Sequence, residues 1–306
     1  MKSFSPQNNF LYFLMLFFVF ISSASLAISK NILTPPSAPL PAVAGASENL
    51  PPLPVIDNVS SFPIISAESA LAVDIESNTV LFEKNPDVQL LPASTTKIIT
   101  ALVSLDAYPL DKVLEVPKDI IKVDGQKMGL TPREKIKVED LLYGLLVYSA
   151  NDAAETLAKN YSQGREAFIK AMNVKVQDLS MENSHFANPV GFDEDDQHST
   201  ARDLVKAAEV AMRNPEFAKI VATRQVLVHD ASGKISYNLK NINQLLGTVP
   251  GVMGVKTGWT ENARENLVTY IERDGHKIMV VVLGSQDRFG ETKELIDWIF
   301  TSYKWE

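Results

Sequence analysis

The chain is most informative at residues 91–107, which read LPASTTKIITALVSLDA. Apolar residues recur within this stretch at helical spacing, at Ile98, Ile99, Leu102 and Leu105. A helix is therefore predicted to begin at Ser94. On a helix, Ser94 and Lys97 lie on one face about one turn apart, so the lysine amine can reach the serine hydroxyl.

A Ser-x-x-Lys pair of this kind can carry covalent catalysis. Serine is a poor nucleophile until a base removes its proton, and lysine can be that base when burial or a nearby positive charge lowers its pKa towards neutrality. A helix N-terminus also directs backbone N–H groups at a developing oxyanion. The alternative is that Ser94 only caps the helix and Lys97 is solvated. Taken alone, the pair favours this structural interpretation.

Two further motifs lie downstream. Ser149-Ala150-Asn151 lies between an almost wholly apolar stretch at 138–148 and a second helical stretch at 151–159, where short polar side chains could enter a cleft. A capping box of Ser149 with Asp152 is the alternative. Lys256-Thr257-Gly258 lies on a predicted strand. Its lysine and hydroxyl suit a carboxylate, and its glycine allows an extended peptide to approach and pair with the strand. On its own, Lys-Thr-Gly is more often a strand end and turn.

In this order, the three motifs form the signature of penicillin-binding proteins and class A β-lactamases. The surrounding sequence resembles the low-molecular-mass penicillin-binding D-alanyl-D-alanine carboxypeptidases of the DD-peptidase/β-lactamase superfamily, over about residues 66–305. The resembling stretches are LPASTTKI (91–98), YSANDAA (148–154), HFANPVGF (185–192), HSTARD (198–203), GVKTG (254–258) and NLV (266–268).

The resemblance implies an α/β fold of the β-lactamase/DD-peptidase type. In it, helices flank an antiparallel sheet, a helical subdomain is inserted, and the site lies in the cleft between them. The sequence pattern agrees, because predicted strands at both ends enclose a mostly helical middle. The predicted strands cover 70–76, 80–84, 254–258, 265–272 and 277–283, and the further predicted helices cover 166–179, 200–212 and 291–303.

The resemblance also implies the catalytic roles. Ser94 attacks the carbonyl between two terminal D-alanines, Lys97 takes its proton, and Ser149 relays a proton to the leaving D-alanine. Asn151 orients Lys97 and a substrate amide. The remaining expected contacts are with the substrate. Lys256 and Thr257 bind its terminal carboxylate, and the strand at Gly258 pairs with the substrate backbone. The backbone N–H groups of Ser94 and Trp259 stabilise the oxyanion. Arg288 is a candidate for a second carboxylate ligand, with a solvated surface arginine as the alternative.

The implied reaction is that of a serine-type D-Ala-D-Ala carboxypeptidase. It removes the last D-alanine from peptidoglycan stem pentapeptides through an acyl-enzyme that water hydrolyses, with no metal or organic cofactor and with β-lactams as covalent inhibitors. A DD-endopeptidase of wall cross-links uses the same groups and stays open. A serine β-lactamase is less favoured, because no counterpart of the class A glutamate motif is recognisable between Asn151 and Lys256. A non-catalytic penicillin-binding module is a fourth interpretation. Trp259 is larger than the residue expected there in many relatives, which leaves the substrate side preference open.

Composition and the N-terminus set the compartment. The 306 residues carry a formal net charge of -8 and no cysteine, which argues against nucleic acid as a partner and excludes thiol chemistry. Lys2, an apolar run at 10–21 and small residues to Ala27 predict export by residues 1–29, either as a cleaved signal or as a membrane anchor. Beyond them we expect a Pro/Ala/Ser-rich linker at 30–64 and a catalytic domain at 65–306. The enzyme is expected outside the cytoplasm, with any membrane tether at the N-terminus.

Overall fold

The computed structural model describes residues 51–58 and 61–306. The predicted export segment and most of the predicted linker lie outside these residues. The last part of the predicted linker contains β1 (Pro54–Ile56), which pairs antiparallel with β11 (Tyr303–Trp305) at the C-terminus. A proline-rich composition gave no indication of this strand, because its hydrogen-bond partners lie about 250 positions further along the chain. Residues 51–306 form one compact unit.

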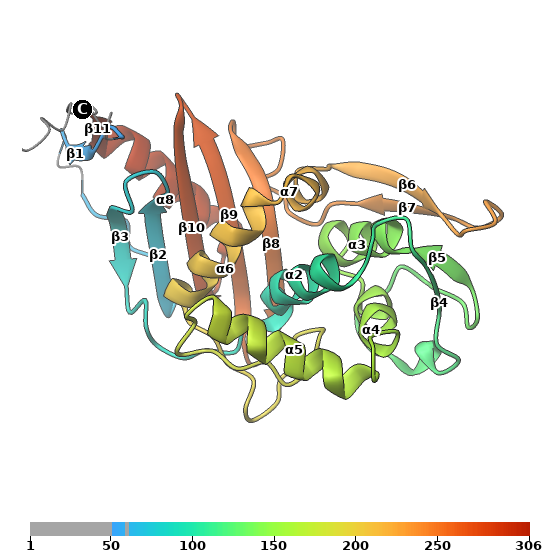
Figure 1. Cartoon of the computed structure of the whole chain (residues 1–306). Helices are drawn as coiled ribbons and strands as arrows, with labels where there is room; N and C mark the ends of the chain where they lie inside the picture. Colours follow the sequence, from blue (N-terminus) through green and yellow to red (C-terminus); the bar gives the residue numbers. More distant parts are fainter. Residues whose placement is uncertain (1–50, 59–60) are drawn as a thin grey trace, which may run out of the picture. The chain divides into compact units, whose positions relative to one another are not determined.

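A five-stranded antiparallel sheet is the centre of this unit (Figure 1). Its strands, in spatial order, are β3 (Val80–Lys84), β2 (Ser69–Asp74), β10 (His276–Ser285), β9 (Arg264–Arg273) and β8 (Val252–Thr260). The two predicted N-terminal strands, which pair with each other, and the three predicted C-terminal strands are therefore confirmed. The first and last segments of the domain meet in the middle of the sheet, and β8 forms one of its edges.

Both faces of the sheet are buried, which explains why its central strands are nearly continuous runs of apolar residues. In β10, Ile278, Val280 and Val282 face the core beneath α8 (Arg288–Ser302), whereas the residues between them face the larger, helical core. The amphipathic helix α6 (Ala201–Arg213) covers that second face. In Figure 1, α6 crosses in front of the sheet and α8 lies behind it.

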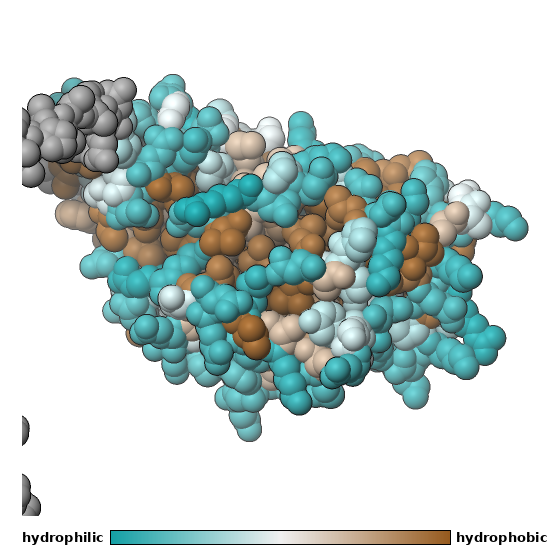
Figure 2. Space-filling model, in the orientation of Figure 1, coloured by the Kyte–Doolittle hydropathy of each residue, from teal (hydrophilic) through white to brown (hydrophobic). Residues whose placement is uncertain are grey.

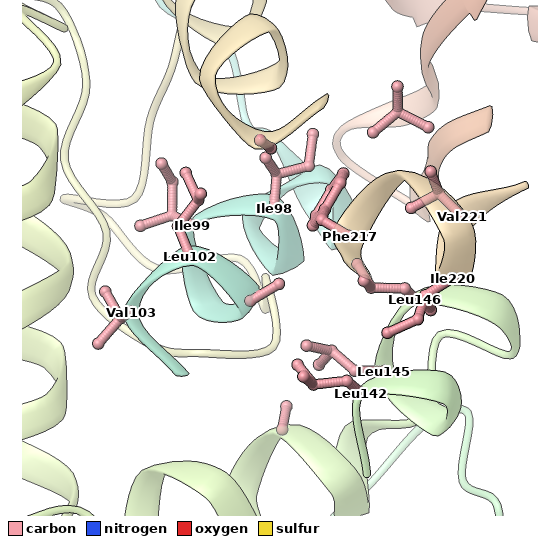
Figure 3. Close-up of a cluster of buried hydrophobic side chains, with 14 of the residues drawn as sticks. Ile98, Ile99, Leu102, Val103, Leu142, Leu145, Leu146, Phe217, Ile220 and Val221 are labelled. Carbon is pink, nitrogen blue, oxygen red and sulfur yellow. The ribbon is translucent and has the colours of Figure 1, made fainter. Parts of the chain in front are cut away.

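The inserted helical part packs beside the edge strand β8. It contains α2 (Lys97–Ala107), α3 (Val138–Val147), α4 (Asn151–Lys159), α5 (Arg165–Asp178) and α7 (Pro215–Val221). Figure 3 shows Ile98 of α2 beside Phe217 of α7 in one apolar cluster, to which Leu145 and Leu146 of α3 also belong. Because α2 and α3 are buried almost all round, each holds a fixed position relative to the sheet.

Smaller elements complete the unit, and the sequence patterns gave no clear indication of them. They are the 3₁₀ turn η2 (Ile120–Lys122), the pair β4 (Val113–Glu115) and β5 (Lys135–Lys137), and the hairpin β6 (Gln225–His229) and β7 (Ser236–Lys240). Within residues 51–58 and 61–306, no helix is long and apolar enough to cross a membrane. Hydrophilic side chains cover much of the face shown in Figure 2, with apolar patches between them.

Candidate active site

Ser94 lies on a 3₁₀ turn and not, as predicted, at the start of an α-helix. The turn, η1, spans Ala93–Thr96, and α2 begins at Lys97. Ala93 has a left-handed backbone, with φ of 47°, a conformation that disfavours a regular helical start. The spacing argument still holds, because the Nζ of Lys97 lies 2.8 Å from the Oγ of Ser94.

Lys97 is completely buried, so its ammonium form loses hydration. Burial lowers its pKa to about 7. The amine donates a hydrogen bond to the carbonyl oxygen of Val190 at 2.7 Å. A neutral amine held by that bond keeps its lone pair available for the proton of Ser94. This geometry would allow Lys97 to act as a general base towards Ser94.

The carbonyl of Val190 is held in place by Asn188, whose side chain is fully buried. The Oδ1 of Asn188 accepts hydrogen bonds from the N–H groups of Val190, Gly191 and Phe192, at 3.2, 2.8 and 3.0 Å. Gly191 is required here, because a Cβ at this position would lie 1.9 Å from the carbonyl oxygen of Ala93. The HFANPVGF stretch therefore fixes the position of the carbonyl group that accepts the hydrogen bond from the Lys97 amine.

Ser149 lies between α3 and α4, as predicted, with its hydroxyl 2.9 Å from the Nζ of Lys256, which donates to it. Its φ of 61° is left-handed, and such strain in a non-glycine residue is common at functional sites. The capping-box alternative is wrong, since no side chain caps α4. Asp152 instead accepts hydrogen bonds from three successive backbone N–H groups at residues 128–130.

Asn151 differs from its predicted contact. Its Nδ2 donates to the carbonyl oxygen of Asp124 at 2.9 Å, and none of its hydrogen bonds reaches Lys97. Asn151 still lines the cleft, beside Gly125. Lys97 is instead hydrogen-bonded to the backbone carbonyl of Val190.

The edge strand β8 supplies the other predicted groups. Lys256 is buried, and burial together with the positive charges of Lys97 and Arg288 lowers its pKa well below the usual value. Gly258 packs closely on the turn η1, because a Cβ there would lie 3.1 Å from the backbone nitrogen of Ser94. The Nη1 of Arg288 donates to the carbonyl oxygen of Gly258 at 3.0 Å. Arg288 is thus a partly buried residue of the cleft, which argues against the solvated alternative.

Most of the predicted residues line one cleft of about 560 Å³, whereas the buried Lys97 and Lys256 are not among its lining residues. Its walls combine the predicted residues Ser94, Ser149, Asn151, Thr257, Gly258, Trp259 and Arg288 with Gly125, Gln126, Val190, Gly191, Phe192, Ile242, Thr260 and Glu261, to which no role was assigned from sequence. For the loop at 188–192, the available signal in the sequence was the resemblance of the stretch at 185–192 to the family. Within the described residues, no group of three or more His, Asp or Glu side chains is arranged to hold a metal ion.

An antiparallel sheet, a helical subdomain beside its edge strand and a Ser-x-x-Lys turn between them define a protein of the DD-peptidase/β-lactamase class. A family model described as "D-alanyl-D-alanine carboxypeptidase" matches residues 57–287. The chain belongs to this family. Its members act on peptidoglycan peptides outside the cytoplasm and bind β-lactams.

Individual relatives agree with this assignment. The chain is 30% identical to D-alanyl-D-alanine carboxypeptidase DacF of Bacillus subtilis, over 78% of this chain and 63% of that protein. It is 34% identical to a D-alanyl-D-alanine endopeptidase of Escherichia coli, over 79% of this chain and 80% of the relative. The crystal structure of the Streptomyces K15 DD-transpeptidase superposes with a TM-score of 0.75 at 31% identity, covering 79% of this chain and all of that one. The predicted family and fold are confirmed.

Proposed function

We propose that this chain is a serine-type D-Ala-D-Ala carboxypeptidase that acts through an acyl-enzyme on Ser94. The observation that carries the proposal is the 2.8 Å contact between Ser94 and a lysine whose pKa burial lowers to about 7. At neutral pH a substantial fraction of Lys97 is then a free amine, and it lies within proton-transfer distance of the nucleophile.

In acylation, the Oγ of Ser94 forms a bond to the carbonyl carbon of the penultimate D-alanine as its proton passes to Lys97. The backbone N–H groups of Ser94 and Trp259 stabilise the oxyanion. Collapse of the intermediate breaks the C–N bond to the terminal D-alanine. The proton reaches the leaving nitrogen through Ser149, which Lys256 holds by its hydrogen bond. Water then hydrolyses the ester, so that one water is consumed and one D-alanine is released.

The substrate enters as an extended chain along β8, whose outer edge has no strand partner in the sheet. Its terminal carboxylate accepts a hydrogen bond from the hydroxyl of Thr257 and is attracted by the positive potential of Lys256 and Arg288. Asn151 lines the same cleft and would contact a substrate amide there.

The test is release of D-alanine. The purified full chain, in mild detergent, is incubated with a stem pentapeptide ending in D-Ala-D-Ala, and free D-alanine is measured over time. Turnover that disappears in Ser94→Ala supports the proposal. Penicillin acylation of Ser94 without any release of D-alanine would instead indicate a penicillin-binding module without turnover.

A DD-endopeptidase is the second candidate, because one relative at 34% identity carries that name. The two activities share their catalytic groups and differ in the leaving group, which is a single D-alanine in one reaction and a cross-linked stem peptide in the other. Comparing the pentapeptide with a cross-linked dimer of stem peptides as substrates distinguishes them. Faster cleavage of the dimer would assign the endopeptidase.

For localisation, we propose export by residues 1–29 and attachment, if any, through the same segment. The apolar run at 10–21 and the proline-rich residues after it support a membrane anchor with a spacer beyond it. Cell fractionation with N-terminal sequencing tests this. A soluble product that begins after Ala27 indicates a cleaved signal, and a membrane-bound product that retains residues 1–27 indicates an anchor. A membrane-bound product lacking those residues would contradict both.

A further inference from the structure

A second, smaller cavity of about 270 Å³ lies at the base of the β6–β7 hairpin (Figure 1). Arg224 directly precedes β6 and Lys240 ends β7, and both side chains line this cavity. The other lining residues belong to the loop that leads to β8, and they are Asn241, Asn243, Gln244, Leu246 and Thr248. None of these described residues is acidic, although the chain carries a formal net charge of -8. The cavity is therefore a local region of positive charge in an acidic protein.

The two cations of this cavity have no acidic partner. Among the residues that the structure describes, the side chains of Arg224 and Lys240 form neither an ion pair nor a hydrogen bond. The guanidinium of Arg224 packs against the turn at Gly247, since a Cβ on that glycine would lie 2.8 Å from the Cζ of the arginine. This packing contact occupies none of the guanidinium N–H groups, so they remain available to a ligand.

The same cavity contains a buried donor without an acceptor. Asn243 lines the cavity and is only 5% exposed. Its Oδ1 accepts a hydrogen bond from the N–H of Leu245 at 3.0 Å, which fixes the orientation of the amide. Its Nδ2 is buried and has no hydrogen-bond partner in the described part of the chain. A buried N–H group without an acceptor is unfavourable, and a ligand that accepts this hydrogen bond would remove the cost.

Together these groups define the charge and the shape of a ligand. A guanidinium, an ammonium and an amide NH₂ group only donate hydrogen bonds, so the ligand has to accept them. Two unpaired positive charges match a dianion, whereas a carboxylate would leave one of them unmatched. A phosphate monoester carries nearly two negative charges at pH 8, because its second pKa is about 6. Its tetrahedral oxygens can accept hydrogen bonds from three directions at once.

We propose that Arg224, Lys240 and Asn243 form a binding site for a dianionic phosphate group, either free phosphate or a phosphate monoester. The segment 241–243 separates this site from the catalytic cleft, because Ile242 lines that cleft and its two neighbours line the smaller cavity. A phosphate-bearing molecule held here lies next to the catalytic cleft. The inference is independent of the proposed function, since none of the three residues takes part in the proposed chemistry.

Equilibrium dialysis of the full chain in mild detergent against radiolabelled inorganic phosphate tests the site, at pH 8 and constant ionic strength. We expect saturable binding with a Kd on the order of 1 mM, in the range of a few partly exposed charge-assisted contacts. Sulfate should displace the label at similar concentrations, because it is also a tetrahedral dianion. Acetate should require at least about tenfold more, because it leaves one positive charge unmatched.

Glycerol 3-phosphate distinguishes the two sources of the phosphate group. Displacement of the label by glycerol 3-phosphate at concentrations similar to those of inorganic phosphate would assign the site to phosphate monoesters. Displacement by inorganic phosphate and sulfate alone would assign it to the free ion.

Three variants assign the binding to this cavity. Arg224→Gln and Lys240→Gln each remove one positive charge and should weaken phosphate binding about tenfold. Asn243→Asp keeps the acceptor for the N–H of Leu245 but replaces the free donor with a negative charge, so it should abolish measurable binding. Lys234→Gln, which removes an exposed charge between β6 and β7, is the matched control and should bind phosphate like the wild type. Far-UV circular dichroism verifies that each variant is folded.

Several results would overturn the site. One is the absence of saturable phosphate binding by the wild type. Another is binding that Arg224→Gln and Lys240→Gln leave unchanged, and a third is an equal loss in Lys234→Gln, which would show that only the general surface charge attracts the ion. Should Asn243→Asp fail to fold, the two exposed cation variants still decide the outcome. Each of these results leaves the carboxypeptidase proposal unaffected, because that proposal is tested by release of D-alanine.

Discussion

The burial of Lys97 predicts a specific pH dependence of acylation. Burial lowers its pKa to about 7, and only the neutral amine can accept the proton of Ser94. The rate should therefore be full above this pKa and fall as pH decreases through it. At pH 5 about one amine in a hundred is neutral, so acylation should be roughly a hundredfold slower than at pH 8.

The assay is the second-order rate constant for acylation by a fluorescent penicillin, measured by stopped flow at intervals from pH 5 to pH 9. The penicillin is chosen to carry no group that titrates in this range, so the inflection belongs to the enzyme. The positive charge of Lys97 contributes to the lowered pKa of Lys256, so the inflection is a property of the coupled pair. Lys97→Arg keeps the charge but supplies no base, and should be nearly inactive throughout. A flat profile between pH 5 and pH 8, or an active arginine variant, would refute Lys97 as the base.

Four further outcomes are expected from the structure. Intact-protein mass spectrometry should show a penicillin adduct on the peptide that contains Ser94, and Ser94→Ala should show none; an adduct on the variant would rule out this nucleophile. Amidating the substrate C-terminus should lower kcat/KM of the wild type about ten- to a hundredfold and that of Lys256→Ala far less, so equal losses would remove Lys256 from carboxylate recognition. Asn188→Ala should slow acylation at least tenfold and shift the acid limb of the pH profile of acylation, because the carbonyl of Val190 loses its support. A slower rate with an unchanged pH profile would indicate a structural role only. Deleting residues 51–57, which removes β1, should lower the thermal midpoint by a few degrees and leave acylation intact, and an unchanged midpoint would show that the β1–β11 pairing contributes no stability.

Local sequence determined much of this protein. The Ser-x-x-Lys spacing alone placed Ser94 and Lys97 within contact, since residues three apart meet on both α- and 3₁₀-helical turns. Alternating and continuous apolar patterns predicted β2, β3, β9 and β10 as strands, because these patterns depend on nearest neighbours along the chain. Each of the three motifs is weak evidence by itself, and the resemblance to the family supplied what they indicate together.

Only the tertiary structure decided what holds those groups in place. The hydrogen-bond partner of Lys97 is the backbone carbonyl of Val190, and the contact expected from Asn151 is not formed. Every residue has a backbone carbonyl, so the sequence does not indicate which one Lys97 contacts. Arg288 reaches the cleft from α8 through a hydrogen bond to Gly258, thirty positions away, which no local pattern encodes. Side-chain chemistry and short-range periodicity are properties of the sequence itself. Burial, and with it the lowered pKa of Lys97, exists only after distant segments have packed around the amine and excluded water.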